Sequence, residues 1–257
     1  MEVRSAGYTI VEVMLFLAIS ALLLTIVFLG TGNSLYATRF SDSARSLQSF
    51  LQKQYDDIQN GFNDRSNQES CSAGIVNPSP PTGQQGGASD CLLLGKLITL
   101  KPGTSVLHVY DIVGTEPASP NYNESDAALI HDYQPTIVTN TDVSTFSIPW
   151  QAAVSGSKRS ADSTAVDAIA LIESPRSSNI LTYVYKEPAG SYNLTSLVDP
   201  GNIADTNNFN STTNTSNFCI QSADPLASQA KVVLTGGQGQ DVIQLSFTIS
   251  AGDCNGS

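Results

Sequence analysis

The feature that most constrains this chain is a long uncharged stretch near its N-terminus. Residues 13–38 contain no charged side chain, and residues 13–29 are almost wholly aliphatic, aromatic or methionine. A run of this length is sufficient to cross the hydrocarbon core of a bilayer as an α-helix. Glu12 stands at its start, where an ionised carboxylate costs about 2.5–3.5 kcal/mol on an insertion scale. The sequence therefore predicts a membrane-inserted helix whose carboxylate needs a cationic partner.

Two interpretations of this stretch give Glu12 no intermolecular role. A secretory signal peptide normally has a basic flank and an apolar region of roughly 7–15 residues. Here the flank carries Glu2 and Arg4, and the apolar run is longer, although Gly30-Thr31-Gly32 offers a small-residue cleavage site. The second alternative is a plain membrane anchor. Thr9-Ile10-Val11-Glu12 has the S/T-x-x-E pattern of a capping box, in which Glu12 would only serve the first backbone amides of the helix.

A third interpretation supplies the missing partner. Gly7-Tyr8-Thr9-Ile10-Val11-Glu12, followed by the apolar run, resembles the N-terminal processing segment of type IV pilins and type II secretion pseudopilins. The resemblance implies that a prepilin peptidase cleaves between Gly7 and Tyr8, that the new amino group of Tyr8 is methylated, and that Glu12 meets the amine of a neighbouring subunit. Tyr8 stands where phenylalanine is commoner, and Ala6 where a basic residue often precedes the glycine. A desolvated ion pair can specify register even where its net energy is small.

The resemblance also implies an α+β fold, in which a long N-terminal α-helix packs on an antiparallel β-sheet head domain. Gly30 and Gly32 are the expected weak point of that helix, because each glycine costs about 1 kcal/mol relative to alanine. Beyond them, apolar side chains recur every three or four positions, which predicts an amphipathic helix that packs against a sheet. The positions of this stripe are Tyr36, Phe40, Ala44, Leu47, Leu51, Gln54 or Tyr55, Ile58 and Phe62.

Four segments follow from this plan. We expect a leader at residues 1–7, a transmembrane and assembly segment at 8–33, an amphipathic half-helix at 34–62, and an exposed β-rich head at 63–257.

The head is expected to contain hairpins separated by long loops. Loops rich in Asn, Ser, Pro and Gly are predicted at 61–90, 114–142 and 187–217, the last of them exposed and mobile. Strands are predicted where apolar and β-branched residues alternate between turn signals. The expected strands are 92–100 with 105–113, a short strand at 144–149, 166–173 with 180–186, 218–220, and 231–235 with 242–249.

The four cysteines, Cys71, Cys91, Cys219 and Cys254, lie in the part of the chain that a membrane anchor would place outside the cytoplasm. An even number of cysteines in an oxidising compartment favours disulfides, and four cysteines allow three connectivities. The expected pairs are Cys71–Cys91, which closes the first loop, and Cys219–Cys254, which fixes the C-terminus to a strand. Each would stabilise the fold by roughly 3–4 kcal/mol. Four free thiols are the alternative.

No arrangement typical of an enzyme or a metal protein is found in the sequence. His108 and His131 are the only histidines and have no nucleophile motif beside them, and no cysteine pair has zinc-binding spacing. Residues 236–244 match one calcium-binding β-roll repeat, but that repeat binds calcium by stacking, and one copy is typical of a glycine-rich loop. Asn123-Glu124-Ser125-Asp126 is expected to be a solvated acidic loop. We predict no enzyme activity, no cofactor and no metal.

The partners and location are inferred from the resemblance and the charge. A net charge of −11 argues against nucleic acid, which is bound largely through Lys and Arg. The expected function is that of a minor pilin, a structural subunit of a type IV pilus-like filament, with prepilin peptidase, other pilin subunits and an inner-membrane assembly platform as partners. The chain would cross the cytoplasmic membrane once, head outside, before entering an extracellular filament or pseudopilus. A pseudopilin of a secretion or competence machine, and a pilin-anchored adhesin or ligand-binding module, are the alternatives.

Overall fold

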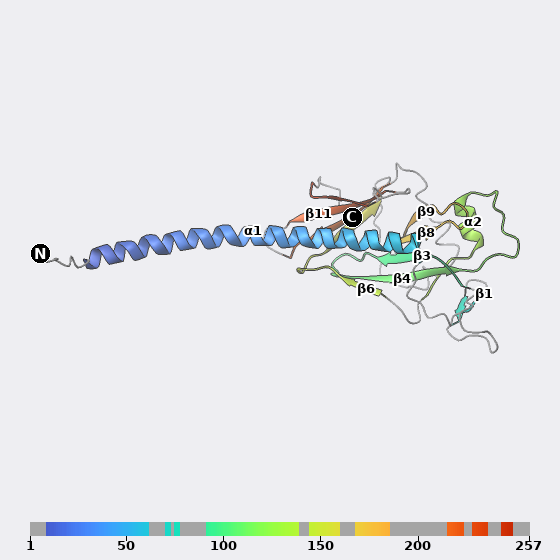
Figure 1. Cartoon of the computed structure of the whole chain (residues 1–257), viewed down its shortest axis with the longest axis horizontal. Helices are drawn as coiled ribbons and strands as arrows, with labels where there is room; N and C mark the ends of the chain where they lie inside the picture. Colours follow the sequence, from blue (N-terminus) through green and yellow to red (C-terminus); the bar gives the residue numbers. More distant parts are fainter. Residues whose placement is uncertain are drawn as a thin grey trace, which may run out of the picture.

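The computed structural model describes residues 9–61, 70–72, 75–77, 91–138, 144–159, 168–185, 215–223, 228–235 and 243–248. These residues form a long helix, a short helix and antiparallel sheets, so the predicted combination of helix and antiparallel sheet is present. Figure 1 shows the long helix projecting from a head into which its second half is built.

The long helix, α1 (Ile10–Gln59), begins at the expected capping box and ends slightly before residue 62, where the amphipathic half was expected to end. Thr9 is the N-cap, and Asn60, followed by Gly61 at φ +65°, ends the helix. The break expected at Gly30 and Gly32 is not present, because α1 is continuous through both residues. Unlike proline, glycine keeps its N–H donor, so the helical hydrogen-bond ladder continues at a cost of about 1 kcal/mol per residue.

The described strands form two larger sheets and one small one, and every recorded strand pair is antiparallel. The six-stranded sheet has the order β5 (Thr136–Ile137), β4 (Val106–Gly114), β3 (Leu92–Thr99), β8 (Ala168–Glu173) and β9 (Ile180–Tyr185), with β6 (Ser144–Ser147) also pairing with β4. The four-stranded sheet has the order β12 (Ile243–Ser246), β11 (Gln229–Thr235), β10 (Thr215–Gln221) and β7 (Ala153–Arg159). The small sheet pairs β1 (Ser70–Ser72) with β2 (Ile75–Asn77).

The predicted hairpins β3–β4, β8–β9 and β11–β12 are confirmed, but the strands of the second sheet were only partly predicted. β7 was missed, and β10 begins at Thr215, inside the tract that was expected to be mobile. Ser216 and Asn217 are buried there, at 2% and 8% exposure. β10 pairs with β7 on one side and β11 on the other. Pairing on both sides therefore outweighs the low β-propensity of this polar sequence.

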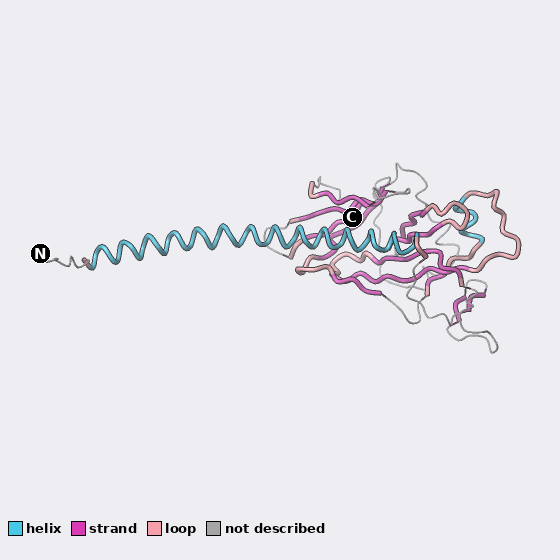
Figure 2. The backbone as a smooth tube through the Cα atoms, in the orientation of Figure 1, coloured by secondary structure: helices cyan, strands magenta, loops and turns pink. Residues whose placement is uncertain are grey.

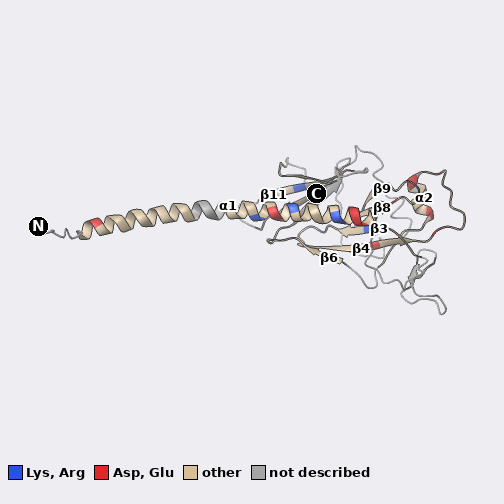
Figure 3. Ribbon diagram, in the orientation of Figure 1, with Lys and Arg blue, Asp and Glu red and all other residues tan. Residues whose placement is uncertain are grey.

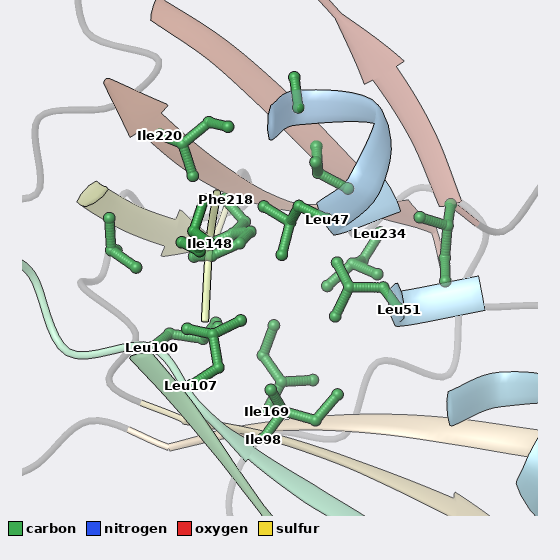
Figure 4. Close-up of a cluster of buried hydrophobic side chains, with 14 of the residues drawn as sticks. Leu47, Leu51, Ile98, Leu100, Leu107, Ile148, Ile169, Phe218, Ile220 and Leu234 are labelled. Carbon is green, nitrogen blue, oxygen red and sulfur yellow. The ribbon is translucent and has the colours of Figure 1, made fainter. Parts of the chain in front are cut away.

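The second half of α1 lies between the two larger sheets, with β11 on one side and β3, β4 and β6 on the other (Figure 1). Its buried stripe joins apolar side chains of both sheets in a single cluster. Figure 4 shows Leu47 and Leu51 of α1 together with Phe218 and Leu234 of the four-stranded sheet, while Ile98 approaches from the six-stranded sheet. The amphipathic half-helix is thus a central element of the core, covered on two sides.

The reverse face of the six-stranded sheet is also covered. Leu97 belongs to a second buried cluster, whereas its neighbour Ile98 faces α1, as the alternation along a strand requires. The cover is α2 (Asp126–Asp132), which contributes Leu129 and Ile130 to this cluster. The expectation of an unstructured loop over 114–142 was therefore wrong.

Candidate functional site

The first half of α1 is an apolar helix with no protein around it. Residues Ile10–Phe28 have a mean hydropathy of 2.7, and none of them is buried. Figure 2 shows no strand or loop beside this part of the helix. Phe16 and Phe28 are 70% and 73% exposed. Burying apolar surface is favourable by about 25 cal/mol per Å², so this segment requires lipid or other apolar helices around it.

Glu12 lies at the start of this apolar segment, on its first turn (Figure 3). The backbone N–H of Glu12 donates to Thr9 Oγ1 at 3.3 Å, which is one half of the expected capping box. No hydrogen bond or ion pair of the Glu12 carboxylate is found within the described part of the chain. Gly7 and Tyr8 lie outside the described residues, so cleavage and methylation there remain predictions.

Side-chain hydrogen bonds fix the second half of α1 to both sides of the head. Ser43 Oγ donates to the carbonyl oxygen of Pro149 at 2.7 Å. Gln48 Nε2 donates to the carbonyl oxygen of Ile243, on the edge strand β12, at 3.1 Å. Together with the core described above, these contacts fix the second half of α1 within the head.

A buried lysine adds a third connection, which the sequence did not suggest. Lys96 of β3 is 3% exposed, and its Nζ donates to Gln54 Oε1 at 3.2 Å and lies 3.4 Å from Asp57 Oδ2. Breaking a buried ion pair is costly because it leaves a charge unsatisfied. Lys96 therefore connects α1 to the six-stranded sheet through two polar contacts. A single lysine within an otherwise apolar strand was the one sequence signal for a buried charge, but it did not identify the partners of that charge.

The acidic loop before α2 was expected to be only solvated, but one of its side chains bonds to another part of the head. Ser125 is the N-cap of α2, and Asp126 lies in its first turn with its side chain 17% exposed. Asp126 Oδ1 lies 2.9 Å from Arg176 Nη2. Side chains of the β8–β9 turn also donate to this carboxylate: Ser174 to Oδ1, and Ser177 and Asn179 to Oδ2. This cluster fixes α2 to that turn, which indicates a structural role.

The Asp126 cluster makes stability depend on pH in a predictable direction. Burial alone raises the pKa of Asp126, but the hydrogen bonds from Ser177, Ser174 and Asn179 and the charge of Arg176 lower it below its ordinary value of 3.8. A carboxylate with a lowered folded-state pKa stabilises the fold above its unfolded-state pKa, and that stabilisation is lost as the pH falls through the folded-state value.

We expect Asp126→Asn to lower the free energy of unfolding by about 1–2 kcal/mol at pH 7, because three donors and a guanidinium lose a charged acceptor. The difference should shrink once the pH falls below the ordinary pKa of 3.8. Urea unfolding of both proteins at neutral and acid pH measures it. A difference that grows on acidification would contradict the assignment.

Two of the four cysteines can be assessed. Cys91 and Cys219 are disulfide-bonded, at 4% and 0% exposure. Cys254 and the side chain of Cys71 lie outside the described residues. The pairing Cys71–Cys91 and Cys219–Cys254 therefore stays a prediction.

The described residues contain no group of His, Cys, Asp and Glu that could hold a metal ion. His108 and His131 are both exposed, and they lie on different elements, β4 and α2. Residues 236–242 of the candidate calcium repeat lie outside the described part of the chain.

Comparisons of the chain with protein-family models, with curated proteins and with solved structures find no match.

Proposed function

We propose that this chain is a minor pilin, a structural subunit of a type IV pilus-like filament that assembles through its N-terminal helix. The observation that carries the proposal is the construction of α1. Its first half is apolar and exposed on all sides, its second half is built into the core of the head, and no break separates them. Within residues 9–38, Glu12 is the only charged residue.

This construction suits a subunit that exchanges one apolar environment for another. In a bilayer, Ile10–Phe28 would be surrounded by lipid, and in a filament by the same segment of neighbouring subunits. The net loss of apolar contact on leaving the membrane is then small. A carboxylate costs about 2.5–3.5 kcal/mol within the membrane, so pairing Glu12 with the amine of a neighbouring subunit would favour the assembled state.

The partners and location follow from the same proposal. Prepilin peptidase would remove residues 1–7 and leave Tyr8 as the methylated N-terminus. The subunit would then wait in the cytoplasmic membrane, head outside, until an assembly platform inserted it into an extracellular filament. The assignment as a minor pilin rests on the large head and its long connections, and so on analogy at the level of the fold.

The proposal is tested by locating the chain in its host. Surface filaments are sheared off, purified and probed for this protein. We expect it in the filament fraction of cells that contain prepilin peptidase, and only in the membrane fraction of cells that lack it. A protein confined to the membrane in both strains would contradict the proposal.

A further inference from the structure

The end of the head from which α1 emerges, which we call the base, is built from three segments. Ser43 of α1 donates to Pro149, and the adjacent backbone N–H of Ile148 donates to the carbonyl oxygen of Ser105 at 2.7 Å. The β3–β4 turn is held to the same region, since the N–H of Gly103 donates to the carbonyl oxygen of Val154 at 2.8 Å. The base is therefore a fixed surface beside the helix.

Trp150 is presented at this base in an unfavourable turn. The N–H of Ala152 donates to Pro149, and both central residues of the turn, Trp150 and Gln151, have positive φ angles of 56° and 57°. Asn and Gly are preferred at such positions, and other L-residues cost about 1–2 kcal/mol each there. Despite that cost, the Trp150 side chain is 55% exposed. Strain that holds an exposed aromatic side chain in place points to a contact outside the chain.

Arg39 of α1 orients the indole. Its guanidinium carbon lies 5.1 Å from the centre of the Trp150 ring, a cation–π contact. Such contacts contribute about 0.5–1 kcal/mol at exposed sites. This is less than the conformational cost of the two residues with positive φ. Tyr36, one turn earlier on α1, is 40% exposed. Arg39, Tyr36 and Trp150 thus bring one cationic and two amphipathic aromatic side chains to the base.

The helix sets the distance between these side chains and a membrane. A span of about 20 residues that starts immediately after Glu12 ends near Gly32, and Arg39 lies roughly 10 Å further along the axis. The headgroup layer is roughly 5–8 Å deep on each side of the hydrocarbon core. Helical side chains lean toward the N-terminus, which for Tyr36 and Arg39 is toward the bilayer. A tilt of about 20°, the average for spanning helices, lowers one edge of the head further.

We propose that the base is a lipid-headgroup contact, in which Trp150, Arg39 and Tyr36 hold the head against the membrane surface while α1 spans the bilayer. Trp and Tyr are enriched at membrane–water interfaces because one part of the ring system is apolar and the other is polar. Among the exposed charged groups of the base, Lys101 in the β3–β4 turn has the same sign as Arg39, while Asp42 of α1 opposes them. Cations at this level attract anionic lipid headgroups. The proposal needs α1 to span a membrane but does not depend on filament assembly.

Trp150 is the only tryptophan of the chain, so its fluorescence reports this contact directly. The full chain is reconstituted into vesicles of phosphatidylcholine and phosphatidylglycerol that carry bromine either close to the headgroup or near the end of the acyl chain. We expect a loss of Trp150 emission with bromine close to the headgroup, a smaller loss with deep bromine, and weaker quenching by dissolved acrylamide than for free indole. Equal emission with and without brominated lipid, together with full acrylamide quenching, would overturn the proposal.

Variants assign the contact to named residues. Arg39→Ala is expected to reduce the loss of emission caused by shallow bromine, because the indole loses its stacking partner. Arg45→Ala removes the same charge from an exposed position on the same helix and should leave the loss unchanged. Equal effects of the two variants would contradict a specific role for Arg39.

Two further results separate this proposal from its alternatives. Glu12→Ala should leave the lipid contact intact, so a failure of filament assembly would not be mistaken for a failure of the base. If Trp150 is unquenched in vesicles but becomes protected from acrylamide only in assembled filaments, the base contacts a neighbouring subunit, and the lipid proposal is wrong.

Discussion

Replacing Glu12 by alanine is expected to remove the protein from filaments while leaving its membrane level unchanged. The variant inserts at least as well as the wild type, because the cost of placing the carboxylate in the membrane, about 2.5–3.5 kcal/mol, disappears. In the proposed filament, assembly would suffer because the amine of the neighbouring subunit would be left buried without a counter-ion. Leaving one member of a buried pair alone costs about 3–5 kcal/mol, which corresponds to a decrease in incorporation of roughly two to four orders of magnitude.

The experiment compares the filament and membrane fractions of cells that express each variant. Glu12→Asp is the matched control, because it keeps the charge on a shorter side chain and should retain partial incorporation. Cleavage of the leader is followed in parallel and is expected to proceed normally in both variants. Normal incorporation of Glu12→Ala would show that the carboxylate serves only the helix start, as in the plain-anchor interpretation.

Replacing Phe218 by alanine is expected to have the largest effect on the stability of the head. Phe218 is fully buried on β10, in the cluster where α1 meets both larger sheets (Figure 4). Truncation of a buried phenylalanine typically costs about 3–5 kcal/mol, since transfer free energy is lost and a cavity is left. A loss of this size is a large fraction of the total stability of a typical domain, about 5–15 kcal/mol.

Phe247→Ala is the matched control, because Phe247 follows β12 and is 49% exposed. It should change the free energy of unfolding by about 0.5 kcal/mol or less. Both variants are unfolded in urea as full chains in the same detergent. Equal midpoints for the two variants would contradict the core described above.

Elements with a strong local pattern could be predicted from the sequence. The stripe that contains Leu47 and Leu51 has the helical period, and it extends α1 well beyond the apolar stretch. The β3–β4 hairpin was recognisable because a proline and Gly103, at φ +83°, mark the turn between two apolar runs. Such signals depend on neighbours in the sequence, so no tertiary information was needed.

The features that were missed depend on contacts distant in sequence. Lys96 is a buried charge only because Gln54 and Asp57 of α1 pack against β3. Asp126 is bound by side chains of the β8–β9 turn, about fifty residues later. For α2 a signal was available, since Ser125 and Asp126 are typical of a helix start. The polar residues around this helix led to the prediction of a loop.

The measurement that tests the central claim most directly is the mass and identity of the N-terminal residue of the mature protein, with prepilin peptidase present and absent. The account predicts a chain that begins at Tyr8 and carries one methyl group on its amine when the peptidase is present, and an uncleaved leader when it is absent. A chain that begins near Asn33 would identify a cleaved signal peptide and a secreted head. An unprocessed Met1 in both strains would leave α1 as a membrane anchor. Either of these two results would contradict the filament-subunit proposal.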